Sequence, residues 1–536
     1  LGADLFGKPV RTVASSRERA VKTGVDNNLA VQFARIGPAI SETQVVAAEA
    51  AFDWVLFSNA TYTKTDSPRV ATVTGATTTT PRSDVSDTFA MTAGLRKTLI
   101  GGGRFTVQND YTYSDNRTPN QNFTPNPAQS SAVTLQWDQP LLRGFGTEVT
   151  LAEVRIARNA ERNAIQSLKR DLISTVTDIE RAYWGLVTAH RDVMILKRLQ
   201  ERGETVRDQL KERTRLDANQ AQIADAIARV ERRRADVLRA QTQLRLASDE
   251  LKRLMNDPEL PVGSEIVLVP ADYAVDAPVK FSLLESLRLA MQNRPELQQA
   301  ILSIDDASIR QTVARNARLP ELNARLQTRF ESLDDNAGEA YGSVFSGEFV
   351  DYVVAMAFEM PIGNRAAEAQ YRQRRLQRMQ AVIAYRNTMQ QIVQEVKSAL
   401  DRVMLNYELI AQTRAARLAA AESLRVLGVE KEVSPQGFTV ERLAVEFSRQ
   451  EELAAAERNE IAAIVDYNTA IADLFAAMGT ALRRNGILFI VPTQEEAEAA
   501  ARNPDLSRLI TPAAEGEDTR AAVERGDPAA AAGSGN

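Results

Sequence analysis

The sequence contains no cysteine and a single histidine, His190, among its 536 residues. Without cysteine the chain forms no disulfide bond and no thiolate metal site. One histidine is too few for a histidine metal cluster or a Ser/His/Asp triad, so we expect His190 to be an ordinary helix residue. The composition therefore predicts no catalytic residue, no metal site and no cofactor, and it disfavours an enzyme.

Long apolar runs and a strong net charge are also missing. No stretch of about 18 or more apolar residues occurs, so we predict no transmembrane helix. A membrane-crossing β-barrel remains allowed, because its strands alternate apolar and polar residues. The formal net charge of -5 is small for this length, so the composition gives no indication of a nucleic-acid partner.

Proline is absent from three long stretches that are rich in Ala, Leu, Arg, Glu and Gln, namely 141–257, 362–434 and 436–491. Through residues 154–199 the apolar residues recur at spacings of three, four and eleven, which predicts a long amphipathic helix. We expect Thr147 to be its N-cap, and we expect a return helix that ends at 256–258. The first stretch therefore predicts an antiparallel helical hairpin.

The other two stretches repeat this pattern. We expect a helix from Ala366 to about Leu427, a break at Gly428–Gly437, and a return helix over 439–478. The helices are too polar for lipid and are expected to stand in water. Charge runs such as Glu231–Arg234 are expected to be mostly a solvated face.

Each helical hairpin follows a block of residues that alternate with period two. One such face carries Phe89, Met91, Ala93 and Leu95, opposite polar neighbours. A tight turn at Gly101–Gly103 joins two of the expected strands, so these glycines do not form a phosphate-binding loop. The predicted strands are 56–65, 88–99, 105–113, 133–137, 322–330 and 351–360.

Two interpretations of the strands remain. In a soluble sandwich the apolar face packs a core, whereas in an outer-membrane barrel the apolar face meets lipid and the polar face lines water. The turn at Gly101–Gly103 is short, while 67–87 and 115–130 are long and rich in Thr, Asn, Pro and Ser. Short turns on one side and long polar loops on the other favour the barrel. One chain supplies too few strands for a wide barrel, so several chains are expected to share it.

The order of strand block, proline turn and helical hairpin occurs twice, with turns at Pro140 and Pro361, which indicates an internal duplication. We predict the following segments: an N-terminal extended segment at 1–26, the first helical segment of repeat one at 27–54, its strands and loops at 55–140 and its helical hairpin at 141–256, an equatorial linker at 257–280, the first helical segments of repeat two at 281–319, its strands at 320–361 and its helical hairpin at 362–480, an equatorial segment at 481–511, and a disordered tail at 512–536.

Several motifs in this order resemble the TolC-like outer-membrane efflux protein family. They cover roughly residues 25–482, and their ordered repetition is more specific than any single motif. Gln139–Gly146 and Met360–Arg365 lead from the last strand of each repeat into a helix, with Pro140, Gly144, Gly146, Pro361 and Gly363 as the turn residues. The other matching motifs are Asn293–Leu297, Ala317–Leu322 and Asp466–Leu474.

The resemblance implies a mainly α fold with β, in which duplicated repeats form a trimeric outer-membrane β-barrel continuous with a periplasmic α-helical barrel. It implies a homotrimer that works with a periplasmic adaptor (membrane fusion) protein and an inner-membrane transporter, contacts outer-membrane lipid, and binds no nucleic acid. The implied function is the exit duct of a tripartite efflux or type I secretion system. The family commonly has two strands per repeat, whereas the hairpin at Gly101–Gly103 gives six per chain here unless it lies outside the wall.

The resemblance also places the working residues at the periplasmic tips of the helices. In the family, acidic rings and polar links between helices hold the tube shut there. The implied gate residues are Glu441, Arg442 and Asp225. The implied adaptor-docking residues are Arg213, Arg215, Asp217, Gly428 and Gly437, with Glu430, Lys431 and Glu432 beside them.

Two other classes of protein compete with the duct. A soluble coiled-coil scaffold with small β modules would show the same helical pattern, and it is separated from the duct by its extraction without detergent. An enzyme is disfavoured, since no paired catalytic residues stand out. The transported substrate is not predicted by the sequence.

Overall fold

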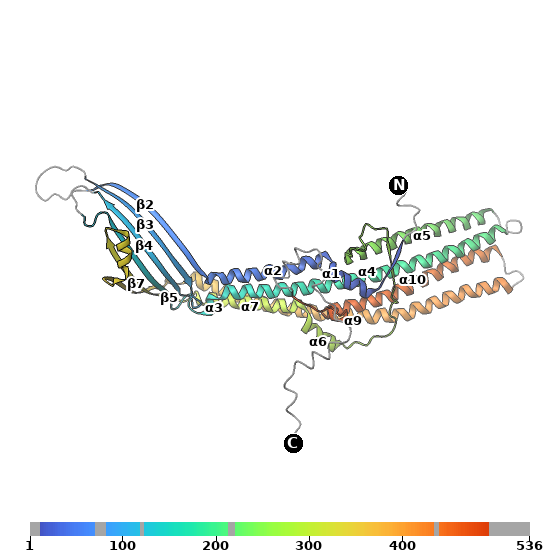
Figure 1. Cartoon of the computed structure of the whole chain (residues 1–536). Coiled ribbons are helices and arrows are strands. Elements are labelled where there is room, and N and C mark those ends of the chain that lie inside the picture. The colour runs from blue at the N-terminus through green and yellow to red at the C-terminus, as the bar shows by residue number, and fades with distance from the viewer. Residues whose placement is uncertain (1–10, 70–81, 118–122, 213–219, 434–438, 492–536) are drawn as a thin grey trace, which may run out of the picture. The chain divides into compact units, whose positions relative to one another are not determined.

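The computed structural model describes residues 11–69, 82–117, 123–212, 220–433 and 439–491 (Figure 1). The chain divides into two compact units. The helical unit contains the described parts of 1–40, 162–300 and 385–536, and the sheet unit contains those of 41–161 and 301–384.

The sheet unit is built on one six-stranded antiparallel sheet in the described chain, in the order β2-β3-β4-β5-β7-β8. The long strands lie side by side in Figure 1. The hairpin around Gly101–Gly103 is β3 and β4, which lie within the sheet between β2 and β5, so the described chain supplies six strands to one sheet, and the hairpin is not separate from it. The strands are β2 Trp54–Arg69, β3 Arg82–Thr98, β4 Arg104–Asn116, β5 Ala128–Pro140, β7 Glu321–Asp334 and β8 Phe349–Glu359.

The sheet has one apolar face and one polar face, as the alternation predicts. One row of directly paired residues on the apolar face is Leu56, Leu95, Val107 and Leu135. A row on the polar face is Arg96, Thr106, Gln136 and Gln327. The apolar face stays largely open, because Leu56 is 76% exposed and Val354 is 79% exposed.

A short helix covers part of the apolar face. The segment between β7 and β8, for which no helix was predicted, forms α8 Ala337–Ser343 followed by η3 Val344–Ser346. Tyr341 stacks on Tyr111 at 5.7 Å between ring centroids, and Phe345 lies 5.8 Å from Phe330. These aromatic contacts fix the helix on β4 and β7.

The predicted long helices are present. They are α4 Ala152–Glu212 and α5 Gln220–Met255 in the first repeat, and α9 Arg365–Val433 and α10 Val440–Ala477 in the second. Within the residues described, none of the helices has the length and hydropathy to cross a membrane. The shorter helices are η1 Ala50–Phe52, α1 Arg17–Asn27, α2 Leu29–Glu49, α3 Thr147–Thr150, α6 Leu283–Asn293, α7 Pro295–Asn316 and α11 Ala481–Arg484.

The core of the helical unit forms where the buried stripes of these helices meet. One cluster joins α4 and α5 to α1, with Tyr183, Ile179 and Leu251 fully or nearly fully buried. A second cluster joins α9 to α10 and includes Val396 and Leu474. The apolar residues that form a stripe in the sequence are therefore the buried residues that hold the hairpins together.

Three local predictions are wrong. Gly428 does not begin the break of the second hairpin, because α9 continues through it to Val433. One exposed glycine costs a helix about 1 kcal/mol, which the rest of a long helix outweighs. Thr147 is not an N-cap, since Gly146 holds that position and makes no side-chain cap. The last error concerns 1–26, which we expected to be extended throughout but which includes most of α1.

The equatorial segments differ from each other. In the first, Val267–Pro270 forms β6 and pairs in parallel with β1, Thr12–Ser15, which confirms the expected strand-like run. In the second, Ile487–Val491 forms no strand in the described chain. Ile487 and Phe489 instead pack against the cluster of α4 and α5, so burial of single side chains replaces strand pairing.

Candidate functional site: polar links of the helical hairpins and turns of the sheet

The start of α10 packs between the two helices of the first hairpin. Val206 of α4, Val230 of α5 and Leu443 of α10 belong to one buried cluster, together with Phe447 of α10. Thr439 caps α10, because its side chain accepts a hydrogen bond from the backbone N–H of Arg442 at 3.4 Å. Figure 1 shows α4, α5, α9 and α10 running side by side. The two hairpins are thus joined near their turns.

A buried arginine crosses this junction. Arg233 of α5 has a side chain that is 5% exposed. It donates to the backbone oxygen of Leu199 on α4 at 2.9 Å and to Gln450 Oε1 on α10 at 2.9 Å. It also donates to the backbone oxygen of Phe447 at 3.1 Å and lies 4.9 Å from the centre of that ring. One side chain therefore links three helices.

The charge of Arg233 is poorly compensated. Its single carboxylate partner is Glu451 at 3.2 Å, which is itself half-exposed, and its Nε is buried without a hydrogen-bond partner among the described residues. Burial lowers the pKa of the Arg233 guanidinium, against the opposing effect of Glu451. A guanidinium stays protonated in proteins, so this lowering measures a cost of burial. Such a link holds the helices in one arrangement more than it stabilises them.

Gly203 of α4 makes room for this arginine. A Cβ at Gly203 would lie 2.6 Å from Nη1 of Arg233. The neighbouring atom is the far end of a flexible side chain, so an added methyl group would displace the guanidinium from its partners. The sequence signal for Arg233 is its position between Val230 and Val237 at helical spacing. The expectation that Glu231–Arg234 is a solvated face is therefore wrong for this one residue, and its three neighbours in the run are exposed.

Two further ionic links join α9 to α10. Lys431 near the end of α9 contacts Glu446 of α10 closely, and both side chains are mostly buried. Farther from the turn, Glu460 of α10 accepts from Arg414 at 2.9 Å and makes a close contact with Arg417. These pairs link α10 to α9, Arg233 links it to α5, and the buried cluster around Leu443 links it to α4.

The predicted gate residues lie near the turns of the hairpins. Glu441 is in the first turn of α10, is exposed, and has no ion-pair partner among the residues described. Arg442 donates to the backbone oxygen of Glu430 at 3.5 Å. Asp225 of α5 pairs with Arg229 of the same helix at 2.9 Å. Their assignment to a gate stays a prediction.

Only some of the predicted docking residues are among the residues that the structure describes. Gly428 lies inside α9, and an added Cβ there would meet no atom within 4 Å. Glu430 and Glu432 are exposed at the end of the same helix. The remaining candidates, Arg213, Arg215, Asp217 and Gly437, lie outside the described residues.

The predicted strand-to-helix turns are present. Gly144 has φ +82° and Gly146 φ +101°, conformations that favour glycine. The N–H of Gly144 donates to Asn316 Oδ1 at 2.7 Å, which ties this turn to the end of α7. In the second repeat Gly363 has φ +88°, following Pro361. The glycines thus let β5 and β8 pass directly into helices.

Comparison with known proteins identifies the fold. No family model matches the chain, and no curated protein matches it in sequence. The outer-membrane channel CmeC of Campylobacter jejuni is 14% identical with a TM-score of 0.61, over 92% of this chain and 89% of that one. The open-state outer-membrane channel MtrE of Neisseria gonorrhoeae is 16% identical with a TM-score of 0.60, over 89% and 94%.

A third solved structure agrees. The outer-membrane protein VceC of Vibrio cholerae is 14% identical with a TM-score of 0.60, over 86% of this chain and 96% of that one. All three likenesses extend over most of both chains, so they concern the helices and the sheet together. The chain has the fold of the TolC-like outer-membrane channels, which confirms at the level of the fold the family resemblance read from its motifs.

Proposed function

We propose that three copies of this chain form an exit duct in the outer membrane, with the sheets as a shared barrel and the helices as a tube in the periplasm. The observation that carries the proposal is the sheet itself. Its apolar face is exposed over several strands, its polar face carries charged side chains, and both of its edges are open. A soluble protein would bury the apolar face, whereas a barrel wall needs lipid outside and water inside.

The open edges support a closed assembly. β2 and β8 form the edges of the sheet, and they are 16 and 11 residues long. Long unpaired edge strands present backbone N–H and C=O groups, which lipid cannot satisfy. Pairing of β8 with β2 of the next copy removes every edge in a ring. With six strands in each of three copies, the wall has eighteen strands.

Aromatic side chains mark two levels of the apolar face. Trp54, Phe105 and Trp137 lie near the helix-bearing end of the strands, and Trp54 meets Phe105 edge-on at 6.3 Å. Tyr62 and Tyr113 lie toward the other end. The eight residues from Trp54 to Tyr62 span about 27 Å along a strand, or about 21 Å of depth at a tilt of about 40°. This separation is close to the height of about 25 Å of the apolar band in outer-membrane barrels.

This placement supports the following proposed partners. The helical unit is charged at its surface and is assigned to the periplasm of a Gram-negative-type envelope. The hairpin tips are assigned to docking with a periplasmic adaptor, behind which an inner-membrane transporter of an efflux or type I secretion system drives transport. The docking residues we propose are Arg213, Arg215, Asp217, Gly428 and Gly437.

The gate is assigned to the same end of the helices. Glu441, Arg442 and Asp225 are its proposed residues, and Arg233 is the link that holds the inner arrangement. Threefold symmetry brings three copies of Glu441 together, and like charges in a narrow lumen repel one another and bind cations. The exposed, unpaired position of Glu441 in the described chain supports this role.

Extraction and mass measurement test the proposed function. The membrane fraction of cells that express the full chain is washed with carbonate, solubilised in detergent and analysed by native mass spectrometry. We expect the protein in the detergent extract at about three times 59.0 kDa, and we expect it to conduct ions in a planar bilayer. A monomer that is released by carbonate and needs no detergent would support the coiled-coil scaffold instead and refute the duct.

Neutralisation of Glu441 tests the gate. In planar bilayers Glu441→Gln should raise the concentration of hexamminecobalt(III) that blocks the conductance, because the cation loses three carboxylates. Glu452→Gln, which removes a half-exposed acid of the same helix that pairs with Arg449, is the control. Identical block of the wild type and Glu441→Gln would remove Glu441 from the gate.

A further inference from the structure

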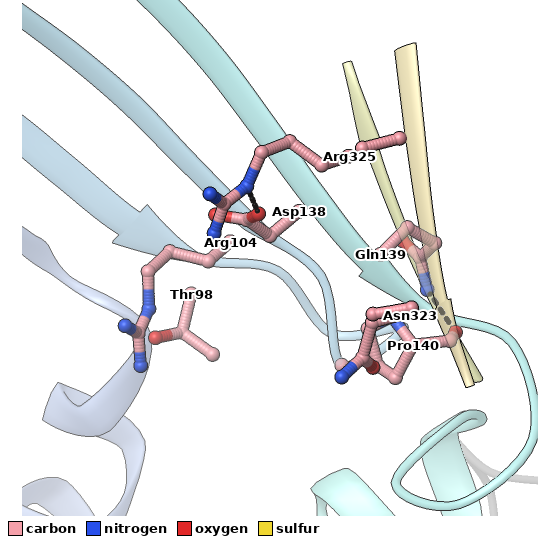
Figure 2. Close-up of a pocket in the computed structure, with 10 residues that line it drawn as sticks. Thr98, Arg104, Asp138, Gln139, Pro140, Asn323 and Arg325 are labelled. Atoms are coloured by element: carbon pink, nitrogen blue, oxygen red, sulfur yellow. Dashed lines mark hydrogen bonds and ion pairs between the residues drawn. The ribbon is translucent and has the colours of Figure 1, made fainter. Parts of the chain in front are cut away.

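The polar face of the sheet is hollowed near the strand-to-helix turns. The hollow has a volume of about 510 Å³. Figure 2 shows side chains from several strands reaching into it. Its lining includes one row of directly paired residues that crosses five strands, namely Thr98, Arg104, Asp138, Arg325 and Ala355.

One of the two arginines in this row is already neutralised. Arg325 donates through Nε to Asp138 Oδ1 at 2.6 Å, and the other oxygen of Asp138 accepts from Gln136 at 2.5 Å. Asp138 therefore has both oxygens occupied. Arg104 is exposed and has no ion-pair or hydrogen-bond partner for its side chain among the described residues. The row keeps one uncompensated positive charge.

The next row on the same face adds a second uncompensated positive charge, that of Arg96. Arg96 occupies it with the uncharged residues Thr106, Gln136, Gln327 and Val353. The guanidinium of Arg96 lies 5.6 Å from the ring of Phe57 and has no carboxylate partner in the described chain. Two rows on one face are about 7 Å apart along the strands, so the charges of Arg96 and Arg104 act together.

Acidic residues also flank these two rows, and Asp138, the carboxylate within the first row, is already occupied by Arg325 and Gln136. On the turn side Glu321 lies opposite Glu359, two rows from Arg325. On the other side Arg329 lies opposite Asp351, and Glu331 occupies the row beyond, which also holds Asp110. The positive charge is thus confined to a band one to two rows high.

We propose that Arg96, Arg104 and Arg325, here called the arginine band, form an anion-binding ring in the lumen near the turns. This inference rests on the proposed function, because it requires the polar face to line water. Guanidinium groups bind carboxylate and phosphate oxygens through forked N–H donors. Three copies bring six uncompensated charges around one opening, whose low-dielectric walls focus their field. The ring attracts small oxyanions and anionic groups of a passing solute.

Ion selectivity in planar bilayers tests the band. Purified trimers are studied in a KCl gradient, and the reversal potential gives the permeability of chloride relative to potassium. We expect the double variant Arg96→Gln/Arg104→Gln to lower that ratio by at least about twofold. The charge-conserving Arg96→Lys/Arg104→Lys should keep it, and Asp138→Asn should raise it. Lys64→Gln, on the opposite face of the sheet, is the matched control and should have no effect.

Citrate serves as a direct probe of binding. Added to the wild-type channel, it should reduce the current, and the double glutamine variant should need at least about fivefold more citrate for the same block. If a conducting glutamine variant keeps the ion selectivity and the citrate block of the wild type, the anion-binding role of the arginine band is refuted. The proposed exit-duct function is unaffected by that result. Absence of any conductance in the wild type would overturn the proposed function, and the band with it.

Discussion

Apolar side chains occupy opposite positions in the two units of this molecule. In the sheet unit Leu56 and Val354 are more than three-quarters exposed, whereas in the helical unit Leu443 and Leu474 are fully buried. A protein in water favours buried apolar residues, because each large apolar side chain that is removed from water stabilises the fold by about 1.5–3 kcal/mol. A wide exposed apolar face is what lipid selects. One chain therefore carries two patterns suited to two solvents.

Charged residues show the same contrast. In the sheet unit many lie on the polar face of the strands, as Arg104 and Arg325 do, although Lys64 and Lys97 lie on the other face. In the helical unit most stand on exposed helix surfaces, and the few that are buried, such as Arg233 and Glu460, join helices. Charged residues therefore serve as a water-facing surface in the sheet unit and as links between helices in the helical unit.

The largest expected effect comes from placing a charge on each face of one strand. Val353 and Val354 are neighbours in β8 and point to opposite faces. Val354→Arg should destabilise the assembled protein by about 2–4 kcal/mol, because the guanidinium enters lipid. Val353→Arg should be tolerated, since it faces water. The yield of detergent-extracted trimer measures both effects. Equal yields of the two variants would contradict the claim that one face meets lipid and the other meets water.

The second effect concerns the buried link between the hairpins. Arg233→Met should lower the free energy of unfolding by about 1–3 kcal/mol through lost hydrogen bonds. It should also raise single-channel conductance, because α10 is released from α4 and α5. Arg239→Met is the control on the same helix, where Arg239 pairs with Asp236 at the surface, and it should change stability by less than about 0.5 kcal/mol.

Thermal denaturation and conductance together decide the role of Arg233. Gly203→Ala should reproduce a weaker form of the Arg233→Met effect, because the added methyl group meets Nη1 of Arg233. A loss of stability without any rise in conductance would mean that Arg233 only packs the helices.

The third effect compares two glycines. Gly428 lies inside α9, in its last two turns, so Gly428→Ala should stabilise the protein by up to about 1 kcal/mol. Gly363 has φ +88°, so Gly363→Ala should destabilise it by about 1–2 kcal/mol although open space surrounds it. Thermal midpoints measure both. Destabilisation by Gly428→Ala would place the break of the second hairpin at Gly428 after all.

The smallest effect is a pH dependence at Asp306 of α7. Burial raises the pKa of the Asp306 carboxyl, and the hydrogen bond from Asn159 at 2.8 Å only partly offsets this. A raised folded-state pKa means that the ionised carboxylate destabilises the fold above the unfolded value of 3.8. Asp306→Asn should therefore raise stability at pH 7 by less than about 0.5 kcal/mol. The gain should vanish near pH 3, and a gain that persists there would have another cause.

The strands and long helices were predictable because their signals are local. Alternation in Phe89, Met91 and Leu95 depends only on the pleat of a strand, and the spacing of Val154 to Leu199 depends only on the turn of a helix. The turns at Gly144 and Gly363 follow from the conformations that glycine permits. The predicted strands are shorter than the observed ones. For example, β2 and β3 extend into segments whose sequence resembles a polar loop.

Features that depend on distant residues were not predictable. Arg233 is buried because Phe447 and Gln450, more than two hundred residues later, surround it. The helix α8 exists on the apolar face because Tyr111 and Phe330 offer partners for its aromatic rings. In the same way, Ile487 finds an apolar cluster to enter instead of a strand to pair with.

The central claim is that the two faces of the sheet meet different solvents, and cysteine labelling tests it most directly. The chain has no cysteine, so single cysteines can be placed along β8 without background. In intact outer membranes a water-soluble maleimide should label residues 353, 355 and 357 and spare residues 352, 354 and 356. Equal labelling of both sets would contradict the account, because both faces would then meet water.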